Sequence, residues 1–333
     1  MKHYNIPVFV PHMGCPHDCV FCSQKTITGT QDLMTPLKAR EIIDKFLSDI
    51  KPEGYIEIAF FGGSFTGIPK DERIEFLKLA SEYVRKGAVS GIRLSTRPDY
   101  ITEEILAELE NFGVTAIELG VQSMDPEVLN LSGRGHTPEC VKNAVRLIRK
   151  YPFELGLQMM TGLPGDTFEK SIKTAEEFVK LKPDTVRIYP TLVIKGTCLE
   201  KMYLDGKYTP MTVEETAELL GELKEIFDSR AIKIIRMGLQ TTDEISRDGE
   251  VVAGPFHEAI GELAESNIYL KKIEKLLENF KEPVAVIGCN SREVSKVVGH
   301  NRCNAKKIFD KYKIKLVVKP DGETDKGKLK ILR

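Results

Sequence analysis

Apolar, β-branched runs alternate with longer segments of helical periodicity over the first two thirds of this 333-residue chain. The expected strands are Val8–Val10, Tyr55–Phe61, Gly91–Ser95, Val114–Gly120, Phe153–Met160 and Thr185–Tyr189, and the expected helices are Pro36–Asp49, Asp71–Arg85, Thr102–Asn111, Thr137–Arg149 and Phe168–Lys180. Parallel neighbours need a crossover helix, and successive right-handed crossovers curl the sheet. The pattern therefore predicts an α/β fold, a full or partial β/α barrel built from six βα units.

The pattern changes near Met211. From there we expect a helix Thr212–Asp228, a strand Ile232–Met237, a helix Phe256–Phe280, and a βααβ order of Val284–Cys289, Ser291–Val298, Asn304–Tyr312 and Ile314–Pro320. The residues from Gly322 onward are expected to be frayed. The predicted organisation is a barrel over residues 1–230, a connecting α/β extension over 231–283, and a small α+β module over 284–333.

Composition restricts the class of protein. No stretch approaches the roughly 18 to 20 consecutive apolar residues of a membrane helix, and Pro7 and Pro11 interrupt the only apolar run near the start. We therefore expect a cytoplasmic protein that does not enter a membrane. The 48 Lys and Arg residues nearly balance the 49 Asp and Glu residues, which taken over the whole chain argues against a dedicated nucleic-acid or membrane binder.

Distinctive residues gather just after the predicted strands. Cys15, Gly62, Gln122 and the run Gly162–Gly165 all occupy such positions. Glycines there can serve simply as turns, but in a β/α barrel the carboxyl ends of the strands carry the active site. The set as a whole therefore predicts an enzyme.

Three of the seven cysteines form a C-x3-C-x2-C run, CPHDCVFC, at Cys15, Cys19 and Cys22. Soft thiolates on one short loop can hold zinc or an iron–sulfur cluster. Structural zinc would need a fourth ligand, which His12 or His17 could supply. A cubane cluster takes one cysteine per iron, so three cysteines leave one iron open. Redox-active thiols are a third alternative, although the spacing is not that of a disulfide oxidoreductase.

This spacing after the first strand of a β/α repeat resembles the radical S-adenosylmethionine (radical SAM) superfamily. The resemblance implies a partial barrel of the radical SAM type, and a 4Fe–4S cluster whose open iron binds S-adenosylmethionine. Phe21 would then pack beside the adenine of that cofactor. The Gly62-Gly63 pair would hold its methionyl amino group with Ser64 beside it, although a plain strand-to-helix turn would look the same.

Two later segments are similar to the branch with the Elongator catalytic subunit and the oxygen-independent coproporphyrinogen III oxidases. They are Ile117–Gly135, with Gln122 and Arg134, and Gln158–Gly165. By this resemblance Gln122 and Gln158 would contact the ribose of the cofactor and Arg134 its carboxylate, which a guanidinium can bind bidentately. The oxidase-like relatives usually carry an acid where this chain has Gln158. A surface ion pair is the alternative for Arg134.

Arg187–Thr197 and Met237–Gln240 look like the corresponding segments of Elongator-type enzymes. Tyr189 and Lys195 would then line the pocket for the acceptor substrate. A core tyrosine and a solvated lysine are the alternatives. We see no segment that matches the acetyltransferase domain or the basic N-terminal region of the Elongator subunit, and therefore expect no site for acetyl-coenzyme A.

Residues 284–333 are strongly basic, with 13 Lys and Arg against 5 Asp and Glu, a balance of about +8 that leaves about −9 for the rest. Their βααβ order around Gly299-His300-Asn301-Arg302 resembles a minimal KH module, in which a GxxG loop clamps single-stranded nucleotides. Gly299, Arg302, Lys306 and Lys307 are the candidate RNA contacts. Arg302 replaces the second glycine, and a basic face that docks on the acidic barrel or is simply solvated is an equal alternative to RNA binding.

The predicted function is that of a radical SAM enzyme that forms a 5′-deoxyadenosyl radical and acts on RNA, as a tRNA base-modifying enzyme. A low-potential electron donor of the flavodoxin or ferredoxin type is implied. One alternative is a radical SAM enzyme with a small-molecule or peptide substrate. Another is a metal-bearing RNA-binding protein without turnover.

Overall fold

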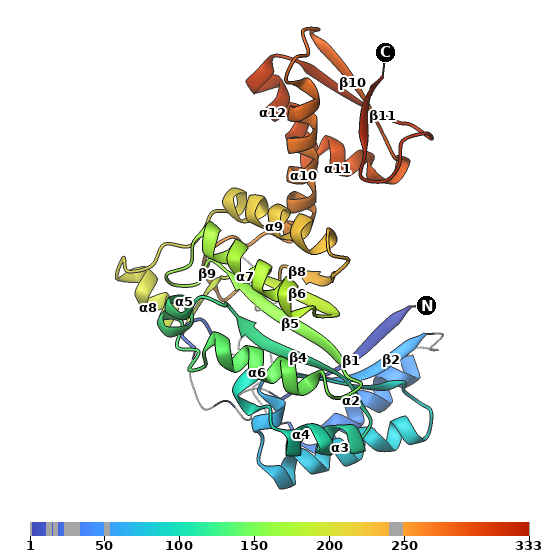
Figure 1. Ribbon diagram of the computed structural model, residues 1–333, viewed down its shortest axis with the longest axis vertical. Coiled ribbons are helices and arrows are strands. Elements are labelled where there is room, and N and C mark those ends of the chain that lie inside the picture. Colours follow the sequence, from blue (N-terminus) through green and yellow to red (C-terminus); the bar gives the residue numbers. More distant parts are fainter. Residues whose placement is uncertain are drawn as a thin grey trace. The chain divides into compact units, whose positions relative to one another are not determined.

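The computed structural model describes residues 2–10, 15, 19–22, 34–49, 54–239 and 249–332. The chain forms two compact units, one of Met1–Pro210 with Phe227–Phe256 and the other of Met211–Ile226 with His257–Arg333. Figure 1 shows the elements of both. The expected extension at 231–283 is shared between the units, because its strand joins the sheet of the first and its helix packs on the sheet of the second.

The first unit is built on a curled sheet of seven parallel strands in the order β1-β2-β3-β4-β5-β6-β8. These strands are β1 (His3–Phe9), β2 (Tyr55–Phe61), β3 (Gly91–Thr96), β4 (Val114–Gln122), β5 (Glu154–Thr161), β6 (Thr185–Pro190) and β8 (Lys233–Met237). Its helices are α2 (Pro36–Asp49), α3 (Lys70–Arg85), α4 (Glu103–Asn111), α5 (Pro126–Leu131), α6 (Pro138–Ile148), α7 (Phe168–Leu181) and α8 (Cys198–Leu204). The predicted partial barrel is confirmed, with β8 as a seventh strand.

Threonine caps set where three of the connecting helices begin. Thr102, Thr137 and Thr167 each accept a hydrogen bond from the amide three residues later, ahead of α4, α6 and α7. The helices then bury an apolar face against the sheet. Phe60 of β2, for example, meets the ring of Phe76 of α3 edge to face at a centroid distance of 5.9 Å.

The first strand is longer than predicted, because it begins at His3 rather than at Val8. It pairs with β2 along its whole length, from His3↔Tyr55 to Phe9↔Phe61. Its early half lacks an apolar run because alternate residues, such as His3 and Asn5, line the polar interior of the half-barrel. A short antiparallel pair that was not predicted, β7 (Val193–Ile194) and β9 (Val251–Ala253), follows β6.

The second unit contains most of α9 (Val213–Asp228) together with the C-terminal elements. These are α10 (Ile260–Leu277), β10 (Val284–Cys289), α11 (Val294–Val298), α12 (Cys303–Tyr312), β11 (Lys315–Pro320) and β12 (Leu329–Leu332). The βααβ order is confirmed, with β11 parallel to β10. The prediction of a frayed end is wrong, since β12 pairs antiparallel with β10 from Val286↔Leu332 to Cys289↔Leu329.

The helices of the described ranges are too short or too polar to cross a bilayer. None of them combines the length and the apolar character that a membrane-crossing helix requires.

Candidate active site at the carboxyl ends of the strands

The three predicted cluster ligands follow the carboxyl end of β1. Cys19 is buried, with 7% of its surface exposed, and Cys15 and Cys22 are half-buried. The amide of Cys22 donates to the carbonyl of Cys19 at 2.9 Å, which closes a tight turn. His12 and His17, the candidate zinc ligands, lie outside the described residues.

Two backbone hydrogen bonds anchor this turn to distant parts of the chain. The Val20 amide donates to the carbonyl of Ser132 at 3.1 Å, and the Leu199 amide donates to the carbonyl of Val20 at 2.7 Å. Phe21 is buried in an apolar cluster with Cys19, Val128, Leu163, Val193, Leu199 and Tyr208. The turn that carries two of the three cysteines is therefore held in place by α8 and by the segment after α5.

Two buried arginines bring positive charge to the thiols. Arg134 Nη1 donates to Cys19 Sγ at 3.1 Å, and Arg97 donates to the carbonyl of Arg134. Burial acts to lower the pKa of Arg97, but the hydrogen bond to Asp99 and the negative charges of Asp99, Cys19 and Cys15 outweigh it and raise that pKa. Nearby guanidinium groups favour the thiolate form of cysteine, which is the form that ligates metals.

The donor set fits a cubane cluster. Among the described residues, no three His, Cys, Asp or Glu side chains converge closely enough to hold a single metal ion. A cubane does not require that convergence, because each cysteine binds a different iron. Three soft thiolates, placed beside guanidinium groups that offset their charge, match what such a cluster needs from Cys15, Cys19 and Cys22.

The glycine pair after β2 forms part of the same rim. Gly62 has a φ of 100°, a backbone conformation that disfavours any side chain. The hydroxyl of Ser64 is buried and lies 2.9 Å from that of Thr96, and it accepts from the Arg97 amide at 3.3 Å. This hydroxyl therefore joins the turns that follow β2 and β3.

The end of β4 brings the three other predicted cofactor contacts together. The register with β5 shifts between Gly120 and Gln122, and Gln122 has a φ of 69°, which is strained for a residue with a side chain. Gln158 Nε2 donates to Gln122 Oε1 at 3.2 Å, and Arg134 donates to the carbonyl of Gly120. Strain of this kind is frequent at ligand sites.

The alternative of a surface ion pair for Arg134 is wrong. The side chain is buried and has no carboxylate within 4.0 Å among the described residues. Its Nε has no hydrogen-bond partner in the described part of the chain. Arg134 therefore keeps one buried donor for a ligand.

The two predicted pocket residues occupy different surroundings. Tyr189 is half-buried on the interior face of β6, with its hydroxyl 3.4 Å from Arg187 Nη1. Lys195 is exposed just after β7, where its amide donates to the carbonyl of Glu250 at 2.9 Å. Gln240, at the end of the matching segment, lies outside the described residues.

The predicted RNA contacts in the second unit surround a tight loop between α11 and α12. Gly299 has a φ of 85°, and a Cβ there would lie 2.6 Å from the sulfur of Cys303. Arg302 itself adopts a left-handed conformation, with φ 62°, so it takes a conformation more usual for the glycine that it replaces. Arg302, Lys306 and Lys307 are exposed.

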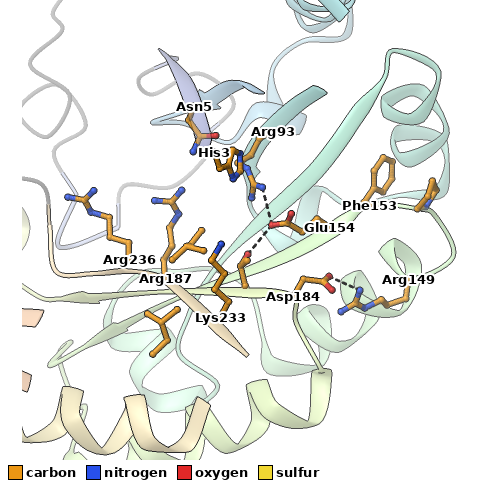
Figure 2. Close-up of a pocket in the computed structure, with 14 residues that line it drawn as sticks. His3, Asn5, Arg93, Arg149, Phe153, Glu154, Asp184, Arg187, Lys233 and Arg236 are labelled. Atoms are coloured by element: carbon orange, nitrogen blue, oxygen red, sulfur yellow. Dashed lines mark hydrogen bonds and ion pairs between the residues drawn. The ribbon is translucent and has the colours of Figure 1, made fainter. Parts of the chain in front are cut away.

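A cavity of about 890 Å³ lies at the opposite end of the half-barrel from the cysteines, at the amino ends of the strands (Figure 2). Residues from β1, β3, β5, β6 and β8 line it. In β/α barrels, conserved chemistry sits at the carboxyl ends, and the amino ends serve stability. This cavity is therefore distinct from the candidate active site.

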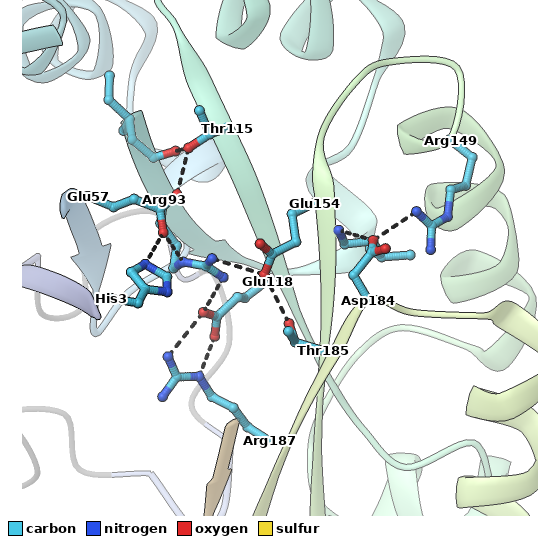
Figure 3. Close-up of polar contacts among 12 residues, drawn as sticks. His3, Glu57, Arg93, Thr115, Glu118, Arg149, Glu154, Asp184, Thr185 and Arg187 are labelled. Atoms are coloured by element: carbon cyan, nitrogen blue, oxygen red, sulfur yellow. Dashed lines mark hydrogen bonds and ion pairs between the residues drawn. The ribbon is translucent and has the colours of Figure 1, made fainter. Parts of the chain in front are cut away.

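Between the two ends, the interior of the half-barrel carries a buried ionic network (Figure 3). Arg93, with 2% of its side chain exposed, pairs with Glu57 at 2.9 Å, Glu118 at 3.2 Å and Glu154 at 3.0 Å. Glu57 also lies 2.7 Å from His3 Nε2. One guanidinium thus joins carboxylates from three strands.

Arg187 continues this network toward the candidate active site. It binds Glu118 through two nitrogens, at 2.5 and 3.1 Å, and its guanidinium lies 5.3 Å from the ring centroid of Phe61. Burial acts to lower the pKa of Arg187, but the charge of Glu118 outweighs it and raises that pKa. Arg187 therefore stays positively charged beside the hydroxyl of Tyr189.

Sequence reasoning missed Glu57, Arg93, Glu118 and Glu154. The available signal was an ionisable residue inside an otherwise apolar strand, which is rare unless the charge is paired. His136 was also missed. It is buried after the Gly133–Gly135 turn, and burial, with the charges of Arg134 and Arg97, lowers its pKa to about 4.

Comparison with known proteins shows the family of the chain. Residues 9–178 match the model of the radical SAM superfamily, and residues 183–272 match that of the radical SAM C-terminal domain. The chain therefore belongs to the radical SAM superfamily, whose enzymes use a 4Fe–4S cluster and S-adenosylmethionine and need an electron donor.

Within the superfamily, the chain is similar to Elongator-type proteins. It is 31% identical to uncharacterised protein MJ0486 of Methanocaldococcus jannaschii over 67% of this chain and 72% of that protein. It is 28% identical to the tRNA uridine(34) acetyltransferase of Dehalococcoides mccartyi, over 66% of this chain and 56% of the relative. For human Elongator complex protein 3 the identity is also 28%, over 64% of this chain and 47% of that protein. The chain thus spans about half the length of these two named relatives.

A solved structure gives the same result. The archaeal Methanocaldococcus infernus Elp3 superposes with a TM-score of 0.62 at 25% identity, and the match covers 81% of this chain and 63% of that chain. The resemblance to the Elongator catalytic subunit is confirmed.

Proposed function

We propose that this radical SAM enzyme modifies a base in RNA, with tRNA as its substrate. The observation that supports the proposal is the likeness to archaeal Elp3, together with the names of the relatives, which act on tRNA uridine 34. The precise modification is not carried over, because the chain spans only part of those relatives.

The proposed roles follow the geometry of the rim. Cys15, Cys19 and Cys22 would hold the cluster, and Gln122 and Arg134 would position S-adenosylmethionine. When bound, the cofactor supplies a 5′-deoxyadenosyl radical after one-electron reduction. A flavodoxin- or ferredoxin-type donor and a cytoplasmic location are part of this proposal.

A basic and aromatic stripe along α12 supports an RNA substrate. Lys306 and Phe309 are three residues apart on one face of the helix, and Arg302 and Lys313 flank its two ends as left-handed cap residues. Among the described residues, no carboxylate lies within 4.0 Å of the three cations. Phe309 is 52% exposed. Cations along a strand of nucleotides, with an aromatic ring for stacking, are the usual means of binding single-stranded RNA.

The substrate is tested by comparing modified nucleosides in tRNA from a deletion strain and from its parent. We expect one modified nucleoside to disappear and to return with the wild-type gene, but not with a Cys19→Ala gene. Identical nucleoside profiles in both strains would contradict the RNA proposal and favour a small-molecule or peptide substrate. A colourless, zinc-bearing protein from anaerobic purification would contradict the cluster.

The stripe is tested by filter binding of tRNA to the full chain. Arg302→Glu with Lys306→Glu should weaken binding by about tenfold or more, because two phosphate-binding charges are reversed. Phe309→Ala should weaken it with little change in salt dependence. Lys275→Glu, at an exposed position on α10 that forms no ion pair within the described ranges, is the matched control. Unchanged binding by the double variant would remove the KH-like hypothesis.

A further inference from the structure

The cavity at the amino ends of the strands has the size of a small-molecule site. Its volume of about 890 Å³ lies near the upper end of the usual range for ligand pockets. Figure 2 shows His3 and Asn5 from β1 on one side, and Arg187, Lys233 and Arg236 from β6 and β8 across from them. The two edge strands of the half-barrel therefore face each other over this space.

Positive charge in the cavity is only partly neutralised. Arg93 and Arg187 are paired with the carboxylates of the interior network, and Arg149 pairs with Asp184 at 2.9 Å. Lys233 and Arg236, in contrast, have no carboxylate within 4.0 Å in the described part of the chain. Arg236 donates through Nε to the carbonyl of Gly238, and its terminal nitrogens have no hydrogen-bond acceptor among the described residues.

The strand register increases this imbalance. Arg187 of β6 and Arg236 of β8 are direct partners in the parallel ladder. Like charges at directly opposed positions repel each other. Glu118 offsets Arg187, but no described carboxylate offsets Arg236. An anion in the cavity would remove the repulsion.

Acceptors share the cavity with these cations. The Oδ1 atom of Asn5 is buried without a hydrogen-bond partner among the described residues, and the carboxylates of Glu154 and Asp184 also line the space. A ligand that satisfies them must carry hydroxyl or amino donors as well as an anionic group. Phosphate, sugar hydroxyls and base amines occur together in nucleotides.

We propose that this cavity binds a phosphate-bearing ligand of nucleotide size, with its phosphate on Lys233 and Arg236 and its donors toward Asn5 and Glu154. A free mononucleotide and a nucleotide within an RNA chain share this chemistry. The proposal does not depend on the proposed function, because it concerns the opposite end of the half-barrel.

The test is calorimetric titration of the reconstituted full-length enzyme, with excess S-adenosylmethionine present to occupy its own site. The probes are the four 5′-nucleoside monophosphates, inorganic phosphate, and a short single-stranded oligoribonucleotide. The variant is Lys233→Glu with Arg236→Glu, and Lys233→Ala serves as a milder change. The control is Lys78→Glu with Lys173→Glu, two exposed lysines on α3 and α7 outside the cavity.

We expect saturable binding of at least one nucleotide probe by the wild type and the control. The charge-reversed variant should lose at least about tenfold in affinity, and Lys233→Ala less. If the charge-reversed variant loses affinity for the monophosphates, the ligand is a free nucleotide. If it loses affinity for the oligoribonucleotide alone, the ligand is RNA. Absence of saturable binding of every nucleotide probe, or equal affinity of the wild type and the folded charge-reversed variant, would overturn the proposal.

Discussion

The middle and the carboxyl rim of the half-barrel both contain buried polar groups, but they differ in how completely those groups are satisfied. Arg93 in the middle pairs with carboxylates from three strands. At the rim, several buried atoms have no partner in the described chain: Ser132 Oγ, Arg134 Nε, Thr161 Oγ1 and Thr191 Oγ1. Unsatisfied buried donors and acceptors are costly and need an explanation. A satisfied network stabilises the barrel, whereas an unsatisfied rim is suited to a ligand.

The largest expected effect falls on the rim. Cys19→Ala should abolish the brown colour of the anaerobically reconstituted protein and the release of 5′-deoxyadenosine in the presence of dithionite, because one of the three proposed cluster ligands is lost. Absorbance and liquid chromatography measure both. Cys198→Ala, an exposed cysteine on α8, is the control and should keep both. Full retention of the cluster in Cys19→Ala would contradict the assigned ligand set.

The second prediction concerns the middle of the barrel. Arg93→Met should lower the free energy of unfolding by about 3 to 5 kcal/mol, because it leaves Glu57 and Glu118 buried without their shared partner. Denaturant unfolding measures this loss. Lys70→Met breaks the exposed pair with Glu104 and should cost at most about 1 kcal/mol. Equal losses in the two variants would mean that the network contributes nothing beyond a surface pair.

The third prediction concerns the pH dependence of stability that His136, a buried residue near the rim, should cause. Burial lowers the pKa of His136 to about 4, below its ordinary value, so the unfolded chain binds a proton that the folded chain excludes. The stability due to the neutral ring is present above the unfolded pKa and is lost as the pH falls toward 4, by about 3 kcal/mol.

Urea unfolding between pH 4 and pH 7 checks this. The wild type should lose more stability over that range than His136→Gln, which has no titrating ring. Parallel pH profiles for the two proteins would show that the imidazole is not buried in its neutral form.

The smallest expected effect falls on the hydroxyl that joins two turns of the rim. Ser64→Ala removes hydrogen bonds to Thr96 and to the Arg97 amide, and should reduce stability by about 1 kcal/mol. If the rim serves the cofactor, the KM for S-adenosylmethionine should rise as well, whereas a purely structural role would change only the melting temperature. Ser48→Ala on exposed α2 is the control.

The sequence predicted what depends on local spacing and missed what depends on pairing across the sheet. The cysteines lie within eight residues, so their shared chemistry can be read from the chain alone. The partners of Arg93 come from β2, β4 and β5, and nothing local indicates that these carboxylates meet. The strand β12 was missed because it is only four residues long and Lys330 interrupts its apolar residues, as is common in edge strands.

The backbone hydrogen bonds of Val20 have a consequence for the lifetime of the enzyme in air. The Val20 amide donates to the carbonyl of Ser132 and the Val20 carbonyl accepts from the amide of Leu199, so one residue links the cysteine turn to two segments more than a hundred residues away. If loss of the proposed cluster loosens the turn, the Leu199 amide would lose its acceptor and become open to solvent exchange. Deuterium uptake at that amide would then report inactivation from a position outside the set of cluster ligands.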